Sequence, residues 1–310
     1  MIDLEPDLYL RGLPDFILKF QHATQHLNTL TSEIGPFIEG DLHPAGGGEF
    51  DIEDDWTVIK WGEVAPIPVR WPLVLGDFLH NARSCLDHLV YALVIANQGN
   101  AGKLTQFPIY ATEKEWTPDI EERDPTAKPN PIEGVSSEAF QAIREMQPFR
   151  ERTPKTRERD GLMHLLRMSN ADKHRLLHTG AVHTGRIERL EFKPTGYVRI
   201  LKRRTPNPGG RVERGAEIAR VRLQWLREPD REIGVHFKQA AQVAFSEPGK
   251  PWIATVADLY KIINRVLEVG AHLERFLEPE ELWFRGLRLH LGADPLGLPM
   301  RPIATATEAT

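Results

Sequence analysis

The chain has 310 residues, 41% of them hydrophobic, and a net charge of −5 at neutral pH. This content is enough for a sizeable core, and an acidic net charge disfavours a general polyanion-binding protein. The single cysteine, Cys85, excludes an internal disulfide framework. No basic-then-apolar signal segment opens the sequence, and the longest apolar run, residues 89–96, is far shorter than the ~20 residues that cross a bilayer. We therefore expect a cytoplasmic protein that makes no membrane contact.

Charge is distributed unevenly along the chain. Residues 1–55 hold twelve acidic and two basic residues, a net charge of −10. Residues 150–204 hold fifteen basic and six acidic residues, a net charge of +9. The basic block either forms a local surface that attracts anions or pairs with the acidic block within the fold.

The first half of the chain predicts two long helices separated by short strands. Apolar residues at helical spacing predict a helix over 10–35, and β-branched and aromatic residues over 51–71 predict a hairpin or edge strands. A second helix follows Pro72 and extends over 72–98, where GNAG ends it. Residues 99–136 are rich in Pro, Gly and charge and predict a long surface excursion.

The second half predicts more helix on either side of a sheet. Helical patterns within 137–180 predict a short helix, SSEAFQAIREMQ, and then a long one, ERDGLMHLLRMSNADKHRLLHTG, and another helix is predicted over 252–278. A period of two over 181–247 predicts an antiparallel β-meander. Residues 291–310 predict an extended or disordered tail. The fold class is therefore α+β: a bundle of N-terminal, central and C-terminal helices with a small β-meander packed beside it, in one domain over 1–290.

The helix over 72–98 carries seven polar side chains in the otherwise apolar stretch GDFLHNARSCLDHLVYAL. On a helical wheel these side chains form two stripes. The stripes are Asp77, Asn81, Ser84 and His88 on one side, and His80, Arg83 and Asp87 on the other. Cys85 falls on the apolar face, which indicates a small core residue instead of a nucleophile.

A comparable stripe occurs on the helix predicted to end at Gly180. Its members are His164, Arg167, His174 and His178. We expect the two helices to face each other, so that their polar residues line a shared crevice.

The segments GDFLHNARSCLDH, FPI and NADKHR resemble a set of uncharacterised bacterial proteins with similar H-N-x-R-S-x-x-D-H and D-K-H-R segments. The spacing from Arg83 to His88 also resembles the R-x-x-x-x-H motif of HEPN domains, helical bundles of which many are metal-independent RNases. This resemblance implies that Arg83 binds the scissile phosphate and that His88 assists proton transfer. It also implies RNA as the partner and a homodimer as the assembly.

Two other interpretations remain open. In the first, the protein is a non-enzymatic interaction module, in which Arg83 and Asp87 form an i, i+4 pair and the buried polar groups satisfy backbone groups of the long loop. In the second, the protein is a metal-dependent hydrolase whose metal ligands come from Asp77, His80, His88, His164, His174 or His178. Neither H-E-x-x-H nor paired E-x-x-H elements occur, so we assign no metal and no cofactor.

The strand pattern suggests where phosphate groups would bind. Alternation places basic residues on the outer face of the meander, namely Arg199, Arg220, Arg222 and Lys238. Trp225 has the parity of the inward face, so no exposed aromatic residue is expected among them.

Overall fold

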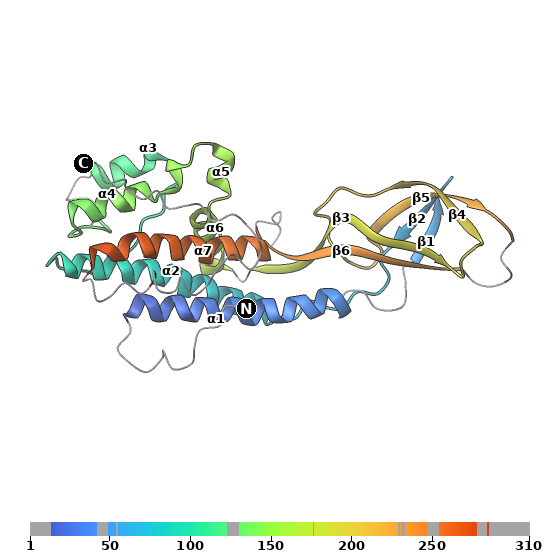
Figure 1. The fold of residues 1–310 in the computed structure, drawn as a ribbon, viewed down its shortest axis with the longest axis horizontal. Helices are drawn as coiled ribbons and strands as arrows, with labels where there is room; N and C mark the ends of the chain where they lie inside the picture. Colours follow the sequence, from blue (N-terminus) through green and yellow to red (C-terminus); the bar gives the residue numbers. More distant parts are fainter. Residues whose placement is uncertain are drawn as a thin grey trace, which may run out of the picture. The chain divides into compact units, whose positions relative to one another are not determined.

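A computed structural model describes residues 14–41, 49–53, 55–122, 130–175, 177–228, 230, 233–246, 254–277 and 284. They form two compact units, which we describe separately. The first contains residues of 1–24, 81–163 and 263–310, and the second contains residues of 25–80 and 164–262. The predicted fold class is confirmed: the protein is α+β, with helices and small antiparallel sheets (Figure 1). The single-domain assignment stays a prediction, and the predicted tail lies outside the described residues.

Helices account for most of the regular structure. The longer ones are α1 (Asp15–Pro36), α2 (Trp71–Ala96), α4 (Ser137–Glu145), α6 (Gly161–His174) and α7 (Val256–Leu273). The shorter ones are η2 (Phe37–Asp41), α3 (Glu113–Trp116), η3 (Thr117–Glu121), η4 (Pro148–Arg150), α5 (Pro154–Glu158) and η5 (Glu274–Phe276). Two helices were predicted within 137–180, a short one over 136–147 and a long one over 158–180, and they correspond to α4 and α6. Pro148 and Pro154 lie between them, where they interrupt the backbone hydrogen bonding of a continuous helix.

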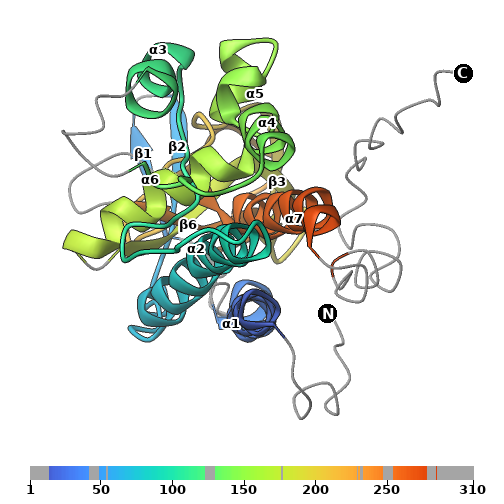
Figure 2. The same ribbon diagram turned by 90° about the vertical axis from the view of Figure 1, so that its left-hand side faces the viewer.

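In the first unit, the start of α1, the second half of α2 and the end of α7 lie side by side (Figure 2). Their shared core is aromatic at one point, where the ring of Phe284 stacks on Phe16 at 5.7 Å and meets the edge of Phe20 at 5.4 Å. Gly270 of α7 permits this approach, because a Cβ there would lie 2.4 Å from the Phe284 ring.

The segment predicted as a surface excursion is partly a core element. Phe107, Trp116 and Ile132 are fully buried, and a Thr112 capping box starts α3 between them. Arg144 of α4 binds the carboxylates of Glu113 and Glu121 and so fastens this segment to the helices. The prediction failed because Pro and charged residues dominate the composition, whereas a few well-spaced apolar residues determine the packing.

The second unit contains the strands, in two antiparallel sheets. They are β1 (Glu49–Glu53), β2 (Trp56–Lys60), β3 (His178–Lys193), β4 (Val198–Arg204), β5 (Glu217–Trp225), β6 (Gly234–Ser246) and β7 (Ala254–Thr255). One sheet has the order β1-β2-β5-β4 and the other has the order β3-β6-β7. The predicted hairpin of β1 and β2 is therefore confirmed, but it joins β4 and β5, because the buried Val58 and Ile59 pair with Arg220 and Ala219.

Candidate functional site

Arg83 and Asp87 of α2 hold the backbone of Phe107. The Arg83 guanidinium donates a hydrogen bond from Nη2 to the Phe107 carbonyl oxygen, and the Phe107 N–H donates to Asp87 Oδ1 at 2.9 Å. The two side chains also pair with each other, with Arg83 Nε 3.5 Å from Asp87 Oδ1. Burial lowers the pKa of Arg83, an effect that the Asp87 carboxylate opposes. Both groups are therefore committed to the backbone of one residue, Phe107, in a distant segment.

Gln147 extends the same arrangement by two residues. Its amide nitrogen Nε2 donates to the Pro108 carbonyl at 2.9 Å, and its Oε1 accepts from the Tyr110 N–H at 3.0 Å. Gln147 is buried, so these bonds form away from water. Gln147 was not predicted as a site residue, and its only signal in the sequence was a polar residue directly before Pro148 at the end of a helical pattern.

The remaining polar residues on this part of α2 have other surroundings. His88 lies 3.7 Å from Asp15, measured from Nδ1 to Oδ2, and Lys19 donates to Asn81 Oδ1 at 3.3 Å. Ser84 is half-buried. Of the predicted catalytic pair, only His88 thus has a substantially exposed side chain, at 40% against 18% for Arg83.

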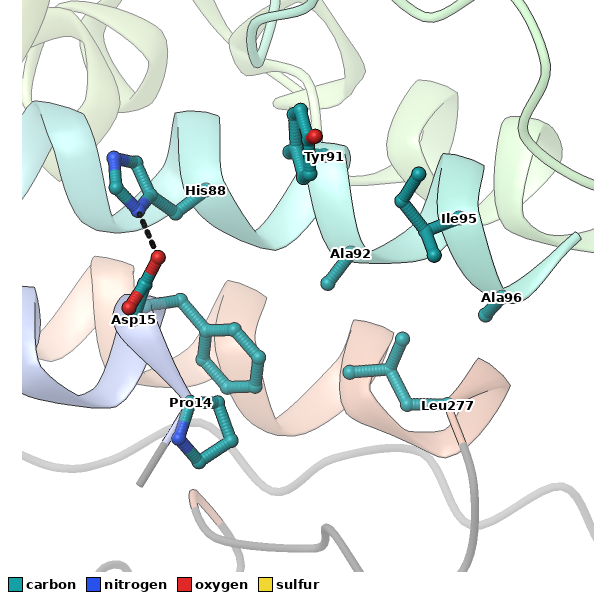
Figure 3. Close-up of a pocket in the computed structure, with 9 residues that line it drawn as sticks. Pro14, Asp15, His88, Tyr91, Ala92, Ile95, Ala96 and Leu277 are labelled. Carbon is teal, nitrogen blue, oxygen red and sulfur yellow. Dashed lines mark ion pairs between the residues drawn. The ribbon is translucent and has the colours of Figure 1, made fainter. Parts of the chain in front are cut away.

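His88 and Asp15 line a pocket of about 370 Å³ in the first unit. The pocket is lined by Pro14, Asp15, Phe16, His88, Tyr91, Ala92, Ile95, Ala96 and Leu277. Figure 3 shows the ionisable pair at one end and Ile95, Ala96 and Leu277 at the other. Tyr91 and Ile95 are each 50% exposed, so these two large side chains of the lining are accessible from solvent.

In the second unit, Asp77 and His80 lie near Asp172 of α6. Burial and the negative charge of Asp77 raise the pKa of Asp172, whereas His80 lowers it. The Asp172 carboxylate also packs against Gly76, where an added Cβ would lie 2.9 Å from its Oδ2. The segments GDFLH and NADKH are therefore in contact through these residues, although the sequence analysis had not placed Asp172 in a polar stripe.

His164 of α6 is buried and faces α7. Its Nε2 lies 3.5 Å from Asp258 Oδ1, and neither ring nitrogen has a hydrogen-bond partner among the described residues. Burial lowers the pKa of His164 in spite of the nearby Asp258 carboxylate, so the neutral imidazole is favoured.

The other members of the His164 stripe are exposed, whereas His164 is buried. Arg167 and His174 are exposed on α6, whereas His178 is exposed on β3. The prediction of a helical His178 is wrong, because α6 ends at His174 and the β-branched Thr179 and Val182 continue as strand. The crevice shared with Arg83 and His88 stays a prediction, since those residues belong to the first unit and His164 belongs to the second.

The predicted phosphate-binding residues have different surroundings. Arg220 pairs with Glu53 and Glu217, and Arg222 pairs with Asp55 at 3.2 Å. Part of the acidic N-terminal block thus neutralises these two cations. Arg199 is exposed on β4. Lys238 lies on β6 in the other sheet, so the four residues do not share one face, and its side chain lies outside the described part.

Aromatic residues are more exposed on this sheet than predicted. Trp225 is 55% exposed, so its predicted inward orientation is wrong, because no described layer covers the end of β5. Trp56 of β2 stacks with two guanidinium groups, those of Arg204 at 4.7 Å and Arg222 at 5.1 Å. Trp56 was not predicted as part of this surface, because β2 was not expected in the same sheet as β4 and β5.

Among the described residues, no group of three or more His, Cys, Asp or Glu side chains is arranged to hold a metal ion. Within the same residues, no helix combines the length and apolar character needed to span a bilayer. Comparison with known proteins gives no assignment: no family model, no curated protein and no solved structure matches this chain.

Proposed function

We propose that the protein is a non-enzymatic binding module, in which Arg83 and Asp87 organise the helical unit. The observation that carries this proposal is the pair of hydrogen bonds to the Phe107 backbone. A phosphate-binding arginine needs free donors in an open site, whereas Arg83 Nη1 is buried with no acceptor among the described residues. These contacts match what the interaction-module interpretation expected, namely polar side chains that satisfy backbone groups of the 99–136 segment.

The pocket along α2 is the binding site in this proposal. Its volume of about 370 Å³ falls in the range of roughly 300–1,000 Å³ that is common for small-molecule sites. Such sites combine mainly apolar walls with a few polar groups that orient the ligand. Here the apolar part is formed by Ala92, Ile95 and Leu277, and the polar groups are His88 and Asp15.

The charge of the lining indicates the class of ligand. The Asp15 side chain is 80% exposed, and the described lining contains no lysine or arginine. With Asp15 facing Nδ1, the His88 Nδ1–H tautomer leaves the Nε2 lone pair free to accept a hydrogen bond. A small amphipathic molecule whose polar end is an amine or a hydroxyl group therefore fits better than a carboxylate or a phosphate.

A displacement assay tests the pocket directly. Decylamine is expected to displace N-phenyl-1-naphthylamine from the protein, and decanoate is expected to displace it weakly. The Ile95→Gln variant should weaken amine binding by about tenfold, since it places a polar group on the apolar wall. The Leu73→Gln variant is the matched control, because Leu73 is also an exposed apolar residue of α2 but does not line the pocket.

An RNase assay separates this proposal from the HEPN-like one. The protein is incubated with mixed RNA in EDTA and in Mg²⁺, together with the Arg83→Ala and His88→Ala variants. The binding module predicts no cleavage above a buffer control under either condition. Cleavage in EDTA that both variants lose would establish the metal-independent RNase instead, and cleavage that only the chelator abolishes would indicate a metal-dependent hydrolase.

A further inference from the structure

We propose that the free edge of β4 binds an extended acidic polypeptide segment of a partner protein by strand addition. This inference concerns the second unit and is independent of the pocket. β4 is the last strand in the order β1-β2-β5-β4, and β5 is its only partner among the described strands (Figure 1). The backbone groups on its other side are therefore available to an added strand.

The side chains of β4 lack the burial expected of a seven-residue strand. All residues from Arg199 to Arg204 are exposed, whereas three of the five residues of β2 in the same sheet are buried. Side chains alternate between the two faces of a strand, so neither face of β4 is covered. A strand in this situation gains little from packing and leaves room for a partner on both faces.

Apolar side chains gather at one end of the β4–β5 pair. Of the nine large apolar residues that are exposed in the described chain, four lie here: Ile200, Leu201, Trp225 and Leu226. Ile200 and Trp225 share one face with Val198 and Leu223, because Val198 lies opposite Trp225 and Ile200 lies opposite Leu223. A contiguous exposed apolar surface of this kind is typical of an interaction site.

Charge selects an acidic partner. β4 carries Arg199, Lys202, Arg203 and Arg204, and none of them forms an ion pair with a carboxylate in the described residues. The cations of the adjacent strand, in contrast, all have such partners, as Arg220 and Arg222 show. The uncompensated positive charge of this sheet is thus confined to the edge strand.

A polypeptide fits this edge better than a nucleic acid or a second copy of the chain. Unpaired N–H and C=O groups along β4 match the backbone of a neighbouring strand and have no counterpart in a nucleic acid. The opposite edge, β1, is acidic, but its Glu49, Asp51 and Glu53 already pair with Arg214, Lys60 and Arg220. An acidic segment from another protein can pair its backbone with β4, and its carboxylates are free to pair with the β4 cations.

The test uses the full chain and a fluorescein-labelled peptide with alternating Glu and Val residues, followed by fluorescence anisotropy. We expect binding that weakens with salt and that falls at least about tenfold in the Arg199→Glu/Lys202→Glu variant. The Arg152→Glu/Lys155→Glu variant is the control, because it makes the same change of net charge at exposed residues of the other unit. This control should bind like the wild type.

Three results would overturn the proposal. The first is equal binding of a peptide of the same charge with proline in place of valine, which cannot form the ladder. The second is tighter binding of a single-stranded oligonucleotide that is lost in the same variant, which would make β4 a nucleic-acid surface. The third is self-association of the protein without peptide, seen as a higher molar mass in analytical ultracentrifugation and abolished by the same variant. This result would assign the edge to a second copy.

Discussion

Replacing Asp87 with alanine tests whether the polar residues of α2 are structural. The substitution leaves the Phe107 N–H without its acceptor and the Arg83 guanidinium without its carboxylate. An unsatisfied buried donor costs about 1–3 kcal/mol, and loss of one partner of a buried ion pair about 3–5 kcal/mol. Because the Asp87 side chain is 27% exposed, water offsets part of this loss. We expect a decrease of about 2–3 kcal/mol in the free energy of unfolding.

The assay is hydrogen exchange at the Phe107 amide combined with urea denaturation. A loss of 2–3 kcal/mol in local stability corresponds to about 30- to 150-fold faster exchange. The Asp87→Asn variant keeps an acceptor for this N–H and should lose only about 1 kcal/mol. Ser84→Ala is the control on the same helix, because Ser84 forms no side-chain hydrogen bond with the part of the chain that the structure describes, and it should change the stability by less than about 0.5 kcal/mol. If Asp87→Ala behaves like Ser84→Ala in both measurements, the structural role is refuted.

Three further predictions follow from burial and close contacts. Burial lowers the pKa of His164 in the folded protein, so the unfolded chain binds a proton at higher pH than the folded protein does. The free energy of unfolding should therefore decrease from pH 7.5 to 5.5, with a smaller slope in His164→Gln, as measured by urea titration at each pH. Gly270→Ala places a Cβ 2.4 Å from the Phe284 ring and should cost about 1–3 kcal/mol, seen as a lower Tm; an unchanged Tm contradicts this packing. Burial raises the pKa of the Cys85 thiol, so DTNB should label it only after unfolding, and rapid labelling of the native protein would show that the α2 face is open.

Sequence periodicity predicted the long helices well because the spacing of apolar residues along the chain determines them. The helix over 72–98 corresponds to α2 at Trp71–Ala96, since Pro72 and the glycines after Ala96 fix both ends. The apolar face assigned to Cys85 is confirmed by its complete burial. Helical spacing and terminal residues are local signals, so one sequence contains them.

The partners of the polar residues could not be predicted in the same way. Asp87 and Gln147 bind main-chain atoms, which have no signature in the sequence because every residue carries the same groups. The meeting of Asp15 and His88 depends on the packing of helices 73 positions apart in the chain. Sheet membership has the same limitation, which is why Trp56 was not associated with Arg222.

The hydrogen bonds to the backbone of Phe107, Pro108 and Tyr110 determine which mutations this protein tolerates. Because Arg83, Asp87 and Gln147 contact amide and carbonyl groups, they recognise a position along the chain and are indifferent to which side chain occupies it. The Phe107 side chain is limited only by the volume of the apolar core around it. Lengthening or shortening residues 99–106 by a single amino acid would place the wrong backbone groups against Arg83, Asp87 and Gln147, so insertions and deletions there should be far more harmful than substitutions.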